Sequence, residues 1–405
     1  MTDILFGIAA FIAIVLFLVG IVIAAKSVLL PNQQVSIAME RGRTLTDKAG
    51  RKLMTALTDA GIDLPGTCGG AGTCGLCRVT VRSGAGEPVP AERAQLSRAD
   101  LHAGLRLACQ ITLRGDVSIE LPASLLKAVS CTAPVRSNRT ITPLIKELVM
   151  ELPADCGLEP EPGAFVEVTA PPFRLPFSDI TVAPEHHPQW DQLGLNRLAA
   201  ASTHAVTRAY SVANRPADTD LIVLNVRLAL PPPGLDLPPG IVSSWLFGLA
   251  PDDKVAIRGP FGNFRVQPTL REMIFIGGGV GMAPLRAMVS DQLDNVGTDR
   301  TISYWYGART MIELIYDDEF RDLARRHKNF TWTVALSDPR PEDDWQGPTG
   351  FIHDVVYDHY LGSHPAPEEC EYYLCGPPLM IAAVRMMLDD IGVESESIYF
   401  DDFGS

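Results

Sequence analysis

A group of four cysteines constrains this chain more than any other feature of its sequence. Cys68, Cys74 and Cys77 lie in one loop with the spacing C-x5-C-x2-C, and 31 residues separate Cys77 from Cys109. Five glycines fall within the same loop, in residues 66–75. Because glycine takes positive φ angles without steric cost, it allows the backbone to approach the sulfur atoms closely. The pattern therefore predicts a site at which four thiolates gather.

The cysteine spacing favours a [2Fe–2S] cluster over other sulfur sites. Plant-type ferredoxins use C-x4-C-x2-C and a distant fourth cysteine, and this loop is one residue longer. A zinc site is the main alternative, but such sites usually combine two C-x2–4-C pairs, and only one is present here. Structural disulfides are a further alternative. We predict that all four cysteines bind the two irons of one cluster.

Charge and the remaining cysteines limit the class of protein. The net charge is −14 and the pI is near 5.0, which argues against nucleic acid as a partner because phosphate binding needs a basic face. Cys131, Cys156, Cys370 and Cys375 are scattered along the chain. This is not the pattern of a disulfide framework, and it indicates a reducing compartment.

The N-terminal 30 residues are predicted to form a membrane anchor. The run Ile4 to Ala25 has 22 residues without a charge or a side-chain amide, which is long enough to span a bilayer core as a helix. A signal peptide is the alternative, but it would need a basic segment before a shorter apolar core, and Asp3 is the only charged side chain there. Basic residues such as Lys26 follow the run. The positive-inside rule then places the N-terminus outside and the rest of the chain in the cytoplasm.

The rest of the chain divides into three patterns. Residues 33–127 combine a helical stretch with short strands, as in an α+β ferredoxin-like domain. Residues 130–266 contain short strands separated by proline and glycine, which predicts a small antiparallel β-barrel, with an insertion at about 171–203 that is long for a plain loop. In residues 269–405 strands alternate with helices, which predicts an α/β domain with a parallel, doubly wound sheet.

A first binding motif lies in the predicted barrel, at Arg208-Ala209-Tyr210-Ser211. It resembles the R-x-Y-S motif of the ferredoxin–NADP reductase superfamily. The resemblance implies that Arg208 holds the FAD pyrophosphate, that Tyr210 packs on the isoalloxazine, and that Ser211 forms a hydrogen bond near flavin N5 and takes part in catalysis. A guanidinium fork suits phosphate, and an aromatic face suits a flat ring.

A second motif, in residues 240–246, resembles the helix-opening G-x-x-S of the same superfamily. Its backbone N–H groups can cap a pyrophosphate. The residues so assigned to FAD are Gly240, Val242, Ser243 and Ser244. Residues 259–262 resemble the turn that ends the family's barrel. Taken singly, Tyr210 or Ser243 could equally be a packing residue; the order of the motifs is what favours an FAD domain.

A glycine-rich turn follows the strand that ends at Ile276 and opens a helix, as phosphate-binding turns do. The usual G-x-G-x-x-G pattern fails at its last position, but the turn resembles the GGxGxxP pyridine-nucleotide turn of the superfamily. A second segment, Cys375-Gly376-Pro377, resembles the one whose cysteine lies beside the nicotinamide C4; a buried structural cysteine is the alternative. The residues predicted to bind NAD are Gly277, Gly278, Gly279, Gly281, Met282, Cys375, Gly376 and Pro377, and Cys375 is also a predicted catalytic residue.

Two further expectations rest on the resemblance. Arg309 could accept a 2′-phosphate, since NADP sites generally use basic residues, but the resemblance favours NADH. Superfamily members often place a C-terminal aromatic residue over the flavin; Phe403 is our candidate and Phe400 the second, and a packed tail is the alternative.

Over its whole length the chain resembles the NADH-oxidising subunits of sodium-translocating NADH:quinone oxidoreductases. The resemblance includes the anchor, the C-x5-C spacing, the insertion and the FDDFG ending. It implies a bacterial inner-membrane protein with a periplasmic N-terminus and cytoplasmic catalytic domains. A hydride would pass from NADH to FAD, and single electrons to the cluster and on to membrane subunits that reduce ubiquinone and export sodium.

Two other functions stay open from the sequence. One is a membrane-tethered NADH reductase component of a bacterial oxygenase, which has the same order of domains. The other is a non-catalytic redox sensor that binds NADH. A sensor would not need a complete relay from hydride to cluster.

Overall fold

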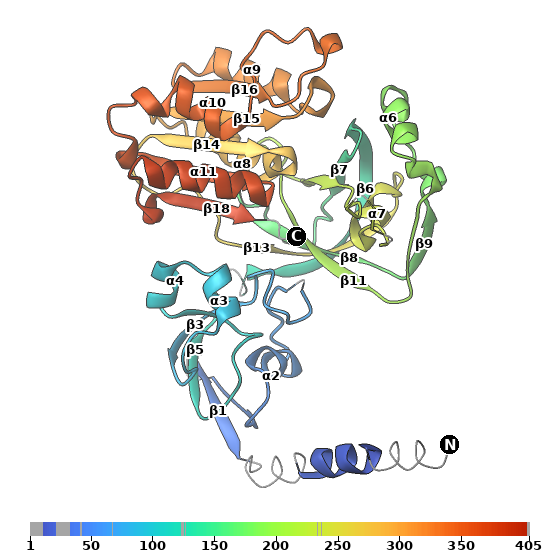
Figure 1. Cartoon of the computed structure of the whole chain (residues 1–405), viewed down its shortest axis with the longest axis vertical. Helices are drawn as coiled ribbons and strands as arrows, with labels where there is room; N and C mark the ends of the chain where they lie inside the picture. Colours follow the sequence, from blue (N-terminus) through green and yellow to red (C-terminus); the bar gives the residue numbers. More distant parts are fainter. Residues whose placement is uncertain are drawn as a thin grey trace. The chain divides into compact units, whose positions relative to one another are not determined.

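The computed structural model describes residues 11–21, 33–40, 43–66, 68–122, 125, 127–232, 234–235 and 237–402. It separates into two compact units, Met1–Pro122 and Ala123–Ser405, drawn in Figure 1. Residues 11–21 of the apolar run form an exposed helix, and the rest of that run lies outside the described residues. In the described parts of the chain, no helix combines the length and the apolar character that crossing a membrane requires.

The first unit contains a five-stranded sheet with the order β2-β1-β5-β3-β4. Its only parallel pair among the described residues is β1 with β5. Helix α2 buries one face through Leu53, Ala56 and Leu57, because apolar residues three and four apart share one side of a helix. The elements are β1 (Gln34–Met39), β2 (Thr44–Lys48), α2 (Leu53–Asp59), β3 (Arg78–Ser83), α3 (Pro90–Gln95), α4 (Arg98–His102), β4 (Leu105–Leu107) and β5 (Val117–Glu120). The expected α+β architecture is confirmed.

The second unit begins with an antiparallel six-stranded sheet of order β11-β8-β13-β6-β7-β12. An antiparallel bridge between Val212 and Leu224 joins the segment after β11 to β12, so the two outer strands meet. Apolar side chains from the inner faces form the core, and helix α7 packs against it. The elements are β6 (Val129–Thr142), β7 (Ile145–Glu151), β8 (Phe165–Ala170), β11 (Val206–Ser211), β12 (Leu221–Arg227), α7 (Ile241–Phe247) and β13 (Lys254–Phe261).

The predicted insertion at 171–203 is a packed structure. Strands β9 (Phe173–Pro176) and β10 (Ala199–Ser202) pair as a hairpin, and helix α6 (His187–Gln192) lies between them in sequence. Trp190 on α6 is buried, and its indole N–H donates to the Pro143 carbonyl at 2.6 Å. The insertion is therefore attached to the barrel by apolar contact and by this hydrogen bond.

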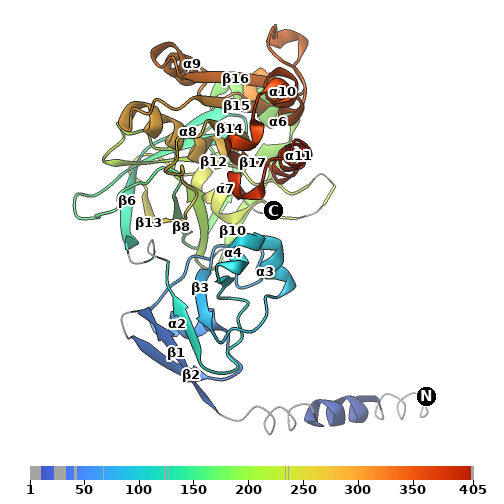
Figure 2. The same cartoon turned by 90° about the vertical axis from the view of Figure 1, so that its left-hand side faces the viewer.

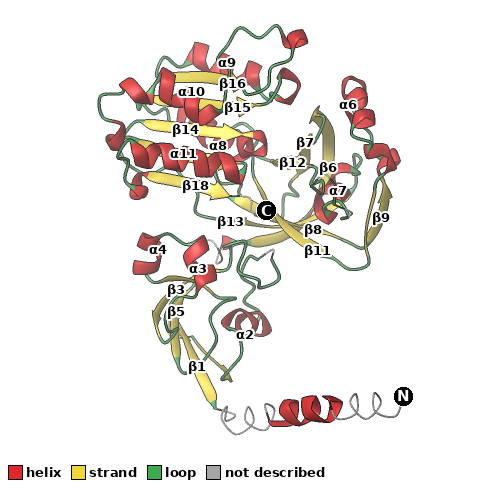
Figure 3. Ribbon diagram, viewed as in Figure 1, coloured by secondary structure: helices red, strands yellow, loops and turns green. Residues whose placement is uncertain are grey.

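The remainder of the second unit is a parallel sheet of order β16-β15-β14-β17-β18. Helices α8 and α9 cover one face and α10 and α11 the other, as Figures 2 and 3 show. The elements are β14 (Met273–Gly278), α8 (Met282–Ser290), β15 (Ile302–Ala308), α9 (Asp317–Arg326), β16 (Phe330–Leu336), α10 (Ile352–His359), β17 (Glu371–Gly376), α11 (Pro378–Asp390) and β18 (Ile398–Asp402). The predicted doubly wound α/β fold is confirmed.

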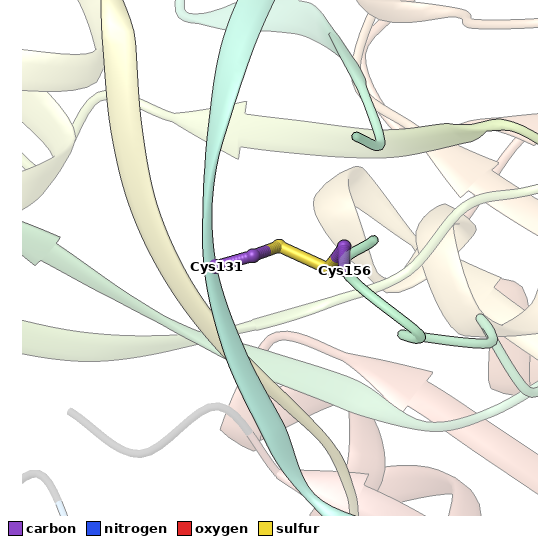
Figure 4. The surroundings of a disulfide bond; sticks show 2 residues. All are labelled: Cys131 and Cys156. Carbon is purple, nitrogen blue, oxygen red and sulfur yellow. A yellow bond between two sulfur atoms is a disulfide. The ribbon is translucent and has the colours of Figure 1, made fainter. Parts of the chain in front are cut away.

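One disulfide bond was not expected from the sequence. Cys131 on β6 and Cys156 in the segment after β7 are joined, with their Cα atoms 5.5 Å apart, as Figure 4 shows. The two cysteines are 25 residues apart in sequence, and the antiparallel pairing of β6 with β7 brings them together. Their spacing alone carries no sign of this bond. One bond is not a disulfide framework, but it departs from the reducing compartment predicted from the scattered cysteines.

Candidate functional site

The loop after α2 carries three of the predicted cluster ligands, and the fourth, Cys109, follows β4. Cys77 and Cys109 are buried, Cys68 and Cys74 are partly exposed, and all four are free thiols. The Sγ atoms of Cys68 and Cys74 lie 3.3 Å apart. Gly69, Gly70, Gly72 and Gly75 in this loop all have positive φ angles, which few other residue types adopt.

The environment of two of these thiols favours the thiolate. Burial acts to raise the pKa of Cys68, but backbone N–H groups, with that of Cys74 the strongest, lower it to about 6. A hydrogen bond from the Cys77 thiol lowers the pKa of Cys109, also to about 6, and raises that of Cys77 itself. The Gln110 amide donates to the Cys109 sulfur at 3.3 Å. Four converging sulfur atoms with N–H donors around them fit an iron–sulfur cluster.

A buried ion pair, which sequence reasoning missed, holds the strand that leads to Cys109. Glu92 is fully buried and accepts hydrogen bonds from Arg106 Nε and Nη2, both at 2.8 Å. The same carboxylate accepts the backbone N–H groups of Leu107 at 3.0 Å and Val89 at 2.9 Å. Nothing in the local sequence distinguishes Glu92 from a surface glutamate. Its role becomes visible only from its contact with Arg106 in the folded structure.

Strand β11 carries the R-x-Y-S residues. Because side chains alternate along a strand, Arg208 and Tyr210 share one face and Ser211 lies on the other. Arg208 is exposed and donates from Nη1 to the Thr207 carbonyl at 2.8 Å. Tyr210 is partly buried against the barrel core, and burial raises the pKa of its hydroxyl. Ser211 is buried at the end of the strand. The hydroxyl of Ser211 donates to Asp401 Oδ2 at 3.4 Å.

The G-x-x-S segment forms the start of helix α7. The hydroxyls of Ser243 and Ser244 donate to the Gly240 carbonyl at 3.1 and 2.7 Å, so both serines hold the backbone of the turn. A Cβ at Gly240 would come within 2.7 Å of the Ala229 side chain and 2.9 Å of Ser243 Oγ. Val242 is buried in the barrel core. The Gly240 N–H donates to the Ala229 carbonyl at 2.8 Å. The N–H groups of the first turn of α7, which a helix start leaves without partners in the helix, are therefore the part of this motif that can approach a ligand.

The other end of α7 is held by two polar side chains of the barrel. Asn138 on β6 donates to the carbonyls of Leu246 at 2.8 Å and Leu249 at 2.9 Å. Lys146 on β7 is buried and donates to the Phe247 carbonyl at 2.8 Å. Burial lowers the pKa of Lys146 to about 8. These contacts satisfy carbonyl groups that a helix end leaves without partners.

The predicted pyridine-nucleotide residues come from two neighbouring strands. Gly281 lies so close to β17 that an added Cβ would be 2.0 Å from the Cys375 carbonyl oxygen. Cys375 is fully buried, and it pairs in register with Gly277 on β14 and with Asp401 on β18. The turn and the cysteine segment therefore meet at the carboxyl ends of β14 and β17. Met282 points into the core, where its sulfur accepts a hydrogen bond from Tyr304 at 3.4 Å, so only its backbone can face a ligand.

The remaining predicted positions lie as follows. Gly278 and Gly376 are buried, and a Cβ at either would meet the Met380 side chain within 3 Å (2.9 and 2.7 Å). Gly279 has a φ of +56° and open surroundings. Pro377 is exposed at the start of α11.

The C-terminal strand brings an acidic residue that the sequence analysis did not single out. Its backbone pairs in register with Cys375 and its side chain accepts the Ser211 hydrogen bond, so Asp401 neighbours both predicted catalytic residues. The sequence feature that could have pointed to Asp401 is its position two residues before Phe403, the residue predicted to cover the flavin. Phe403 itself lies outside the described residues, and Phe400 stacks under the Arg385 guanidinium at 4.5 Å.

A second cluster of metal-ligating groups lies at the opposite end of the parallel sheet. One ligand atom each from Glu272, His364 and Cys370 falls within 4.8 Å of the others. His364 Nδ1 accepts the Ala366 N–H at 3.2 Å, so the imidazole proton resides on Nε2, which lies 3.3 Å from Glu272 Oε2. The cluster is therefore a hydrogen-bonded contact between the beginnings of β14 and β17.

Three family models match successive parts of the chain. Residues 37–114 match the 2Fe-2S iron-sulfur cluster binding domain. Residues 195–266 match the oxidoreductase FAD-binding domain. Residues 275–386 match the oxidoreductase NAD-binding domain. The chain therefore has domains of the types that bind the three predicted cofactors.

Two solved structures with a similar fold are reductases. The Amycolatopsis cytochrome P450 reductase GcoB gives a TM-score of 0.62 at 25% identity, covering 91% of this chain and 98% of that one. The ferredoxin reductase in carbazole 1,9a-dioxygenase gives a TM-score of 0.55 at 26% identity, covering 92% of this chain and 98% of that one.

Curated relatives match end to end. The F subunit of the Na(+)-translocating NADH-quinone reductase of Idiomarina loihiensis is 45% identical, with 100% of both chains covered. That of Klebsiella pneumoniae is also 45% identical, over 99% of this chain and 100% of the relative. Because identity at this level extends over the whole length, the chain belongs to the family of F subunits of Na(+)-translocating NADH-quinone reductases.

Proposed function

We propose that this chain is the NADH-oxidising subunit of a sodium-translocating NADH:ubiquinone oxidoreductase. It would take a hydride from NADH and deliver single electrons to membrane subunits that reduce ubiquinone and export sodium. Bound FAD can accept two electrons together and release them one at a time, which a cluster that takes one electron requires. The observation that carries this proposal is the meeting of Ser211, Asp401 and Cys375 at the edge shared by the barrel and the parallel sheet.

We assign the hydride-transfer region to these three residues. Ser211 and Cys375 are buried, so they would exclude water from the reacting atoms. The Ser211–Asp401 hydrogen bond would fix the position of the hydroxyl and hold a proton close to the flavin. Gly281, with no side chain, lets the turn rest on the backbone of Cys375, which would leave room for a flat nicotinamide ring.

The remaining FAD and NAD residues serve binding. Arg208 extends from β11 into solvent, where its guanidinium can meet a pyrophosphate. The N–H groups that follow Gly240 and those of the turn at residues 277–281 would approach phosphates through the backbone. We place the FAD domain at 130–266 and the NAD domain at 269–405, with Phe403 in a tail that covers the flavin.

The cluster site is assigned to the first unit. Cys68, Cys74, Cys77 and Cys109 would bind the [2Fe–2S] cluster, within a domain at 33–127. Lowered pKa values at Cys68 and Cys109 and the Gln110 donor support thiolate ligation.

We also propose that residues 1–30 anchor the protein in the bacterial inner membrane by one pass. The uncharged run of 22 residues supports this, and the basic residues after it support a periplasmic N-terminus and cytoplasmic catalytic domains. The run carries no carboxyl or amide group. Sodium would therefore cross the membrane in other subunits of the complex.

Activity in native membranes tests the function. Tagged full-length protein, solubilised mildly, would be assayed for NADH-driven quinone reduction with and without sodium. Sodium-stimulated activity in a multi-subunit fraction is expected. The second candidate is a tethered oxygenase reductase, which the likeness to the P450 and carbazole dioxygenase reductases favours. A protein that purifies alone, reduces dyes and ignores sodium would support that candidate instead.

The Cys77→Ser variant tests whether the cluster domain and the flavin domain work independently of each other. Because Cys77 is in the first unit, we expect loss of the cluster absorbance and of its paramagnetic signal, with flavin reduction by NADH unchanged. Loss of flavin reduction as well would show that the two units do not act independently.

A further inference from the structure

A buried arginine joins the barrel to the parallel-sheet domain within the second unit. Arg286 on α8 is almost fully buried. Its Nε and Nη2 atoms donate to the two carboxylate oxygens of Glu319 on α9, at 2.8 and 2.7 Å. Its Nη1 atom donates to the Ala213 carbonyl of the barrel at 2.6 Å. The guanidinium thus forms a bidentate ion pair with Glu319 and a hydrogen bond with the backbone of Ala213.

A tyrosine continues this contact deeper into the barrel. The Arg286 guanidinium stacks on the Tyr316 ring at 4.2 Å. The Tyr316 hydroxyl donates to Glu147 Oε2 on β7 at 2.7 Å and accepts from Asn225 Nδ2 on β12 at 2.6 Å. Tyr316 lies at a left-handed φ of 57° just before α9. Two strands of the barrel and two helices of the other domain therefore share one polar network.

The two ends of the Arg286 contact lie next to the two predicted binding motifs. Ala213 is two residues after Ser211, at the end of the R-x-Y-S strand. Arg286 is five residues after Gly281, in the helix that the glycine turn opens. Ala283 on the same helix packs against Ala213 and Val223 in a small buried cluster. A shift of α8 would therefore move the glycine turn relative to Ser211.

We propose that Arg286 is a positioning residue that sets the distance between the nicotinamide and the flavin. The proposal rests on the function proposed above. Arg286 acts through Ala213 and Glu319, and it need not touch either cofactor. The planar guanidinium matters because one group satisfies a carboxylate by two bonds and a carbonyl by a third. A lysine at this position could supply the charge but not the three directions at once.

Four variants of the full-length protein test the proposal. Arg286→Met removes the network's centre, and Arg286→Lys keeps the charge alone. Tyr316→Phe is the mild variant, since it keeps the ring beneath Arg286 and removes only the bonds to Glu147 and Asn225. Arg325→Met is the matched control: it lies on α9 with an exposed ion pair to Asp322.

The first measurement is stopped-flow reduction of the flavin over a range of NADH concentrations. Misplacement of reacting groups by about 1 Å costs on the order of 100-fold in rate. We expect the limiting rate to fall by about 10- to 100-fold in Arg286→Met and Arg286→Lys and by a few-fold in Tyr316→Phe. The NADH dissociation constant and the FAD content should change little. The control should match the native protein.

The second measurement is amide hydrogen exchange, which does not depend on turnover. Exchange should accelerate together in peptides covering residues 206–214 and 277–286, while peptides of the first unit keep their native rates. A slower flavin reduction that merely follows lost FAD, with exchange raised throughout the second unit, would indicate a structural role and overturn the proposal. Native limiting rates in both Arg286 variants would overturn it too.

This design separates the inference from the proposed function. If the native protein failed to reduce its flavin with NADH, the proposed function would fail before any variant was compared. If the native protein reduced its flavin and the variants did so at the same rate, the proposed function would stand and the positioning role would fall.

Discussion

Single side chains near the end of β11 decide how the region that we propose for hydride transfer is built. Ser211 was predicted from its motif, and Asp401 was found only because β18 returns beside β17. A hydroxyl and a carboxylate 3.4 Å apart form a contact that neither sequence segment reveals alone. The pairing of residues distant in sequence is what the structure adds at this scale.

The Ser211→Ala substitution should slow flavin reduction or deplete FAD, because it removes the hydroxyl that we place beside the flavin. Asp401→Asn should act in the same direction, and the double variant should lose less than the sum of both losses, as expected for groups that act as a unit. Stopped-flow rates with FAD content would check this. Native values of both quantities in Ser211→Ala would remove Ser211 from the site.

The buried Lys146 predicts a pH dependence. Burial lowers its pKa from 10.5 to about 8, so between these values the unfolded chain binds a proton that the folded chain does not. Stability contributed by this group therefore rises with pH from about 8 to 10.5, by at most about 1.4 kcal/mol per pH unit. Unfolding of native protein and Lys146→Met at a series of pH values should show their difference change in that direction. A constant difference would contradict the assignment.

At the scale of elements, periodicity predicted much of the secondary structure and little of what holds it in place. The strands of the parallel sheet and the helices between them are visible in the sequence as alternating apolar segments. The hairpin of β9 and β10, with α6 between them, was expected only as a long insertion, because its packing depends on Trp190 meeting the barrel at Pro143. The buried contacts Glu92–Arg106 and Arg286–Glu319 link charged residues that look like surface residues in sequence.

Loss of the Glu92–Arg106 pair should loosen the strand that carries Cys109. Glu92→Gln leaves a buried guanidinium without its countercharge, and breaking such a pair typically costs about 3 to 5 kcal/mol. Cluster absorbance during urea unfolding would measure the change. Glu120→Gln, which removes the partly exposed partner of the exposed Arg82 in the same unit, is the control and should have a far smaller effect. Equal effects of the two would contradict the role given to Glu92.

For the whole molecule, the sequence identified the order of three domains, and the motifs identified their cofactor types. The family models and the end-to-end relatives agree with that order. The Cys131–Cys156 pair was missed because it depends on tertiary structure. The residue roles at the flavin and the nicotinamide stay predictions, since a motif names residue types and the geometry of a bound cofactor decides what they do.

Removal of residues 1–30 tests the proposed anchor. We expect the truncated protein to leave the membrane fraction, to keep NADH-driven flavin reduction, and to lose sodium-stimulated quinone reduction because it no longer meets its partners. Fractionation of cells and assays on both fractions would show this. Truncated protein that stays in membranes and still supports sodium-stimulated activity would show that other contacts hold it there.

The glycine turn of β14 carries a consequence for sequence variation. Gly281 is fixed by space, since even a methyl group would collide with the Cys375 carbonyl, whereas Gly279 is fixed only by its left-handed backbone and has open surroundings. A saturation library at these two positions should therefore accept asparagine at 279, which tolerates that conformation, and nothing but glycine at 281. The two glycines of one motif would thus be constrained by different properties: position 281 by the available volume, and position 279 by the backbone torsion angle.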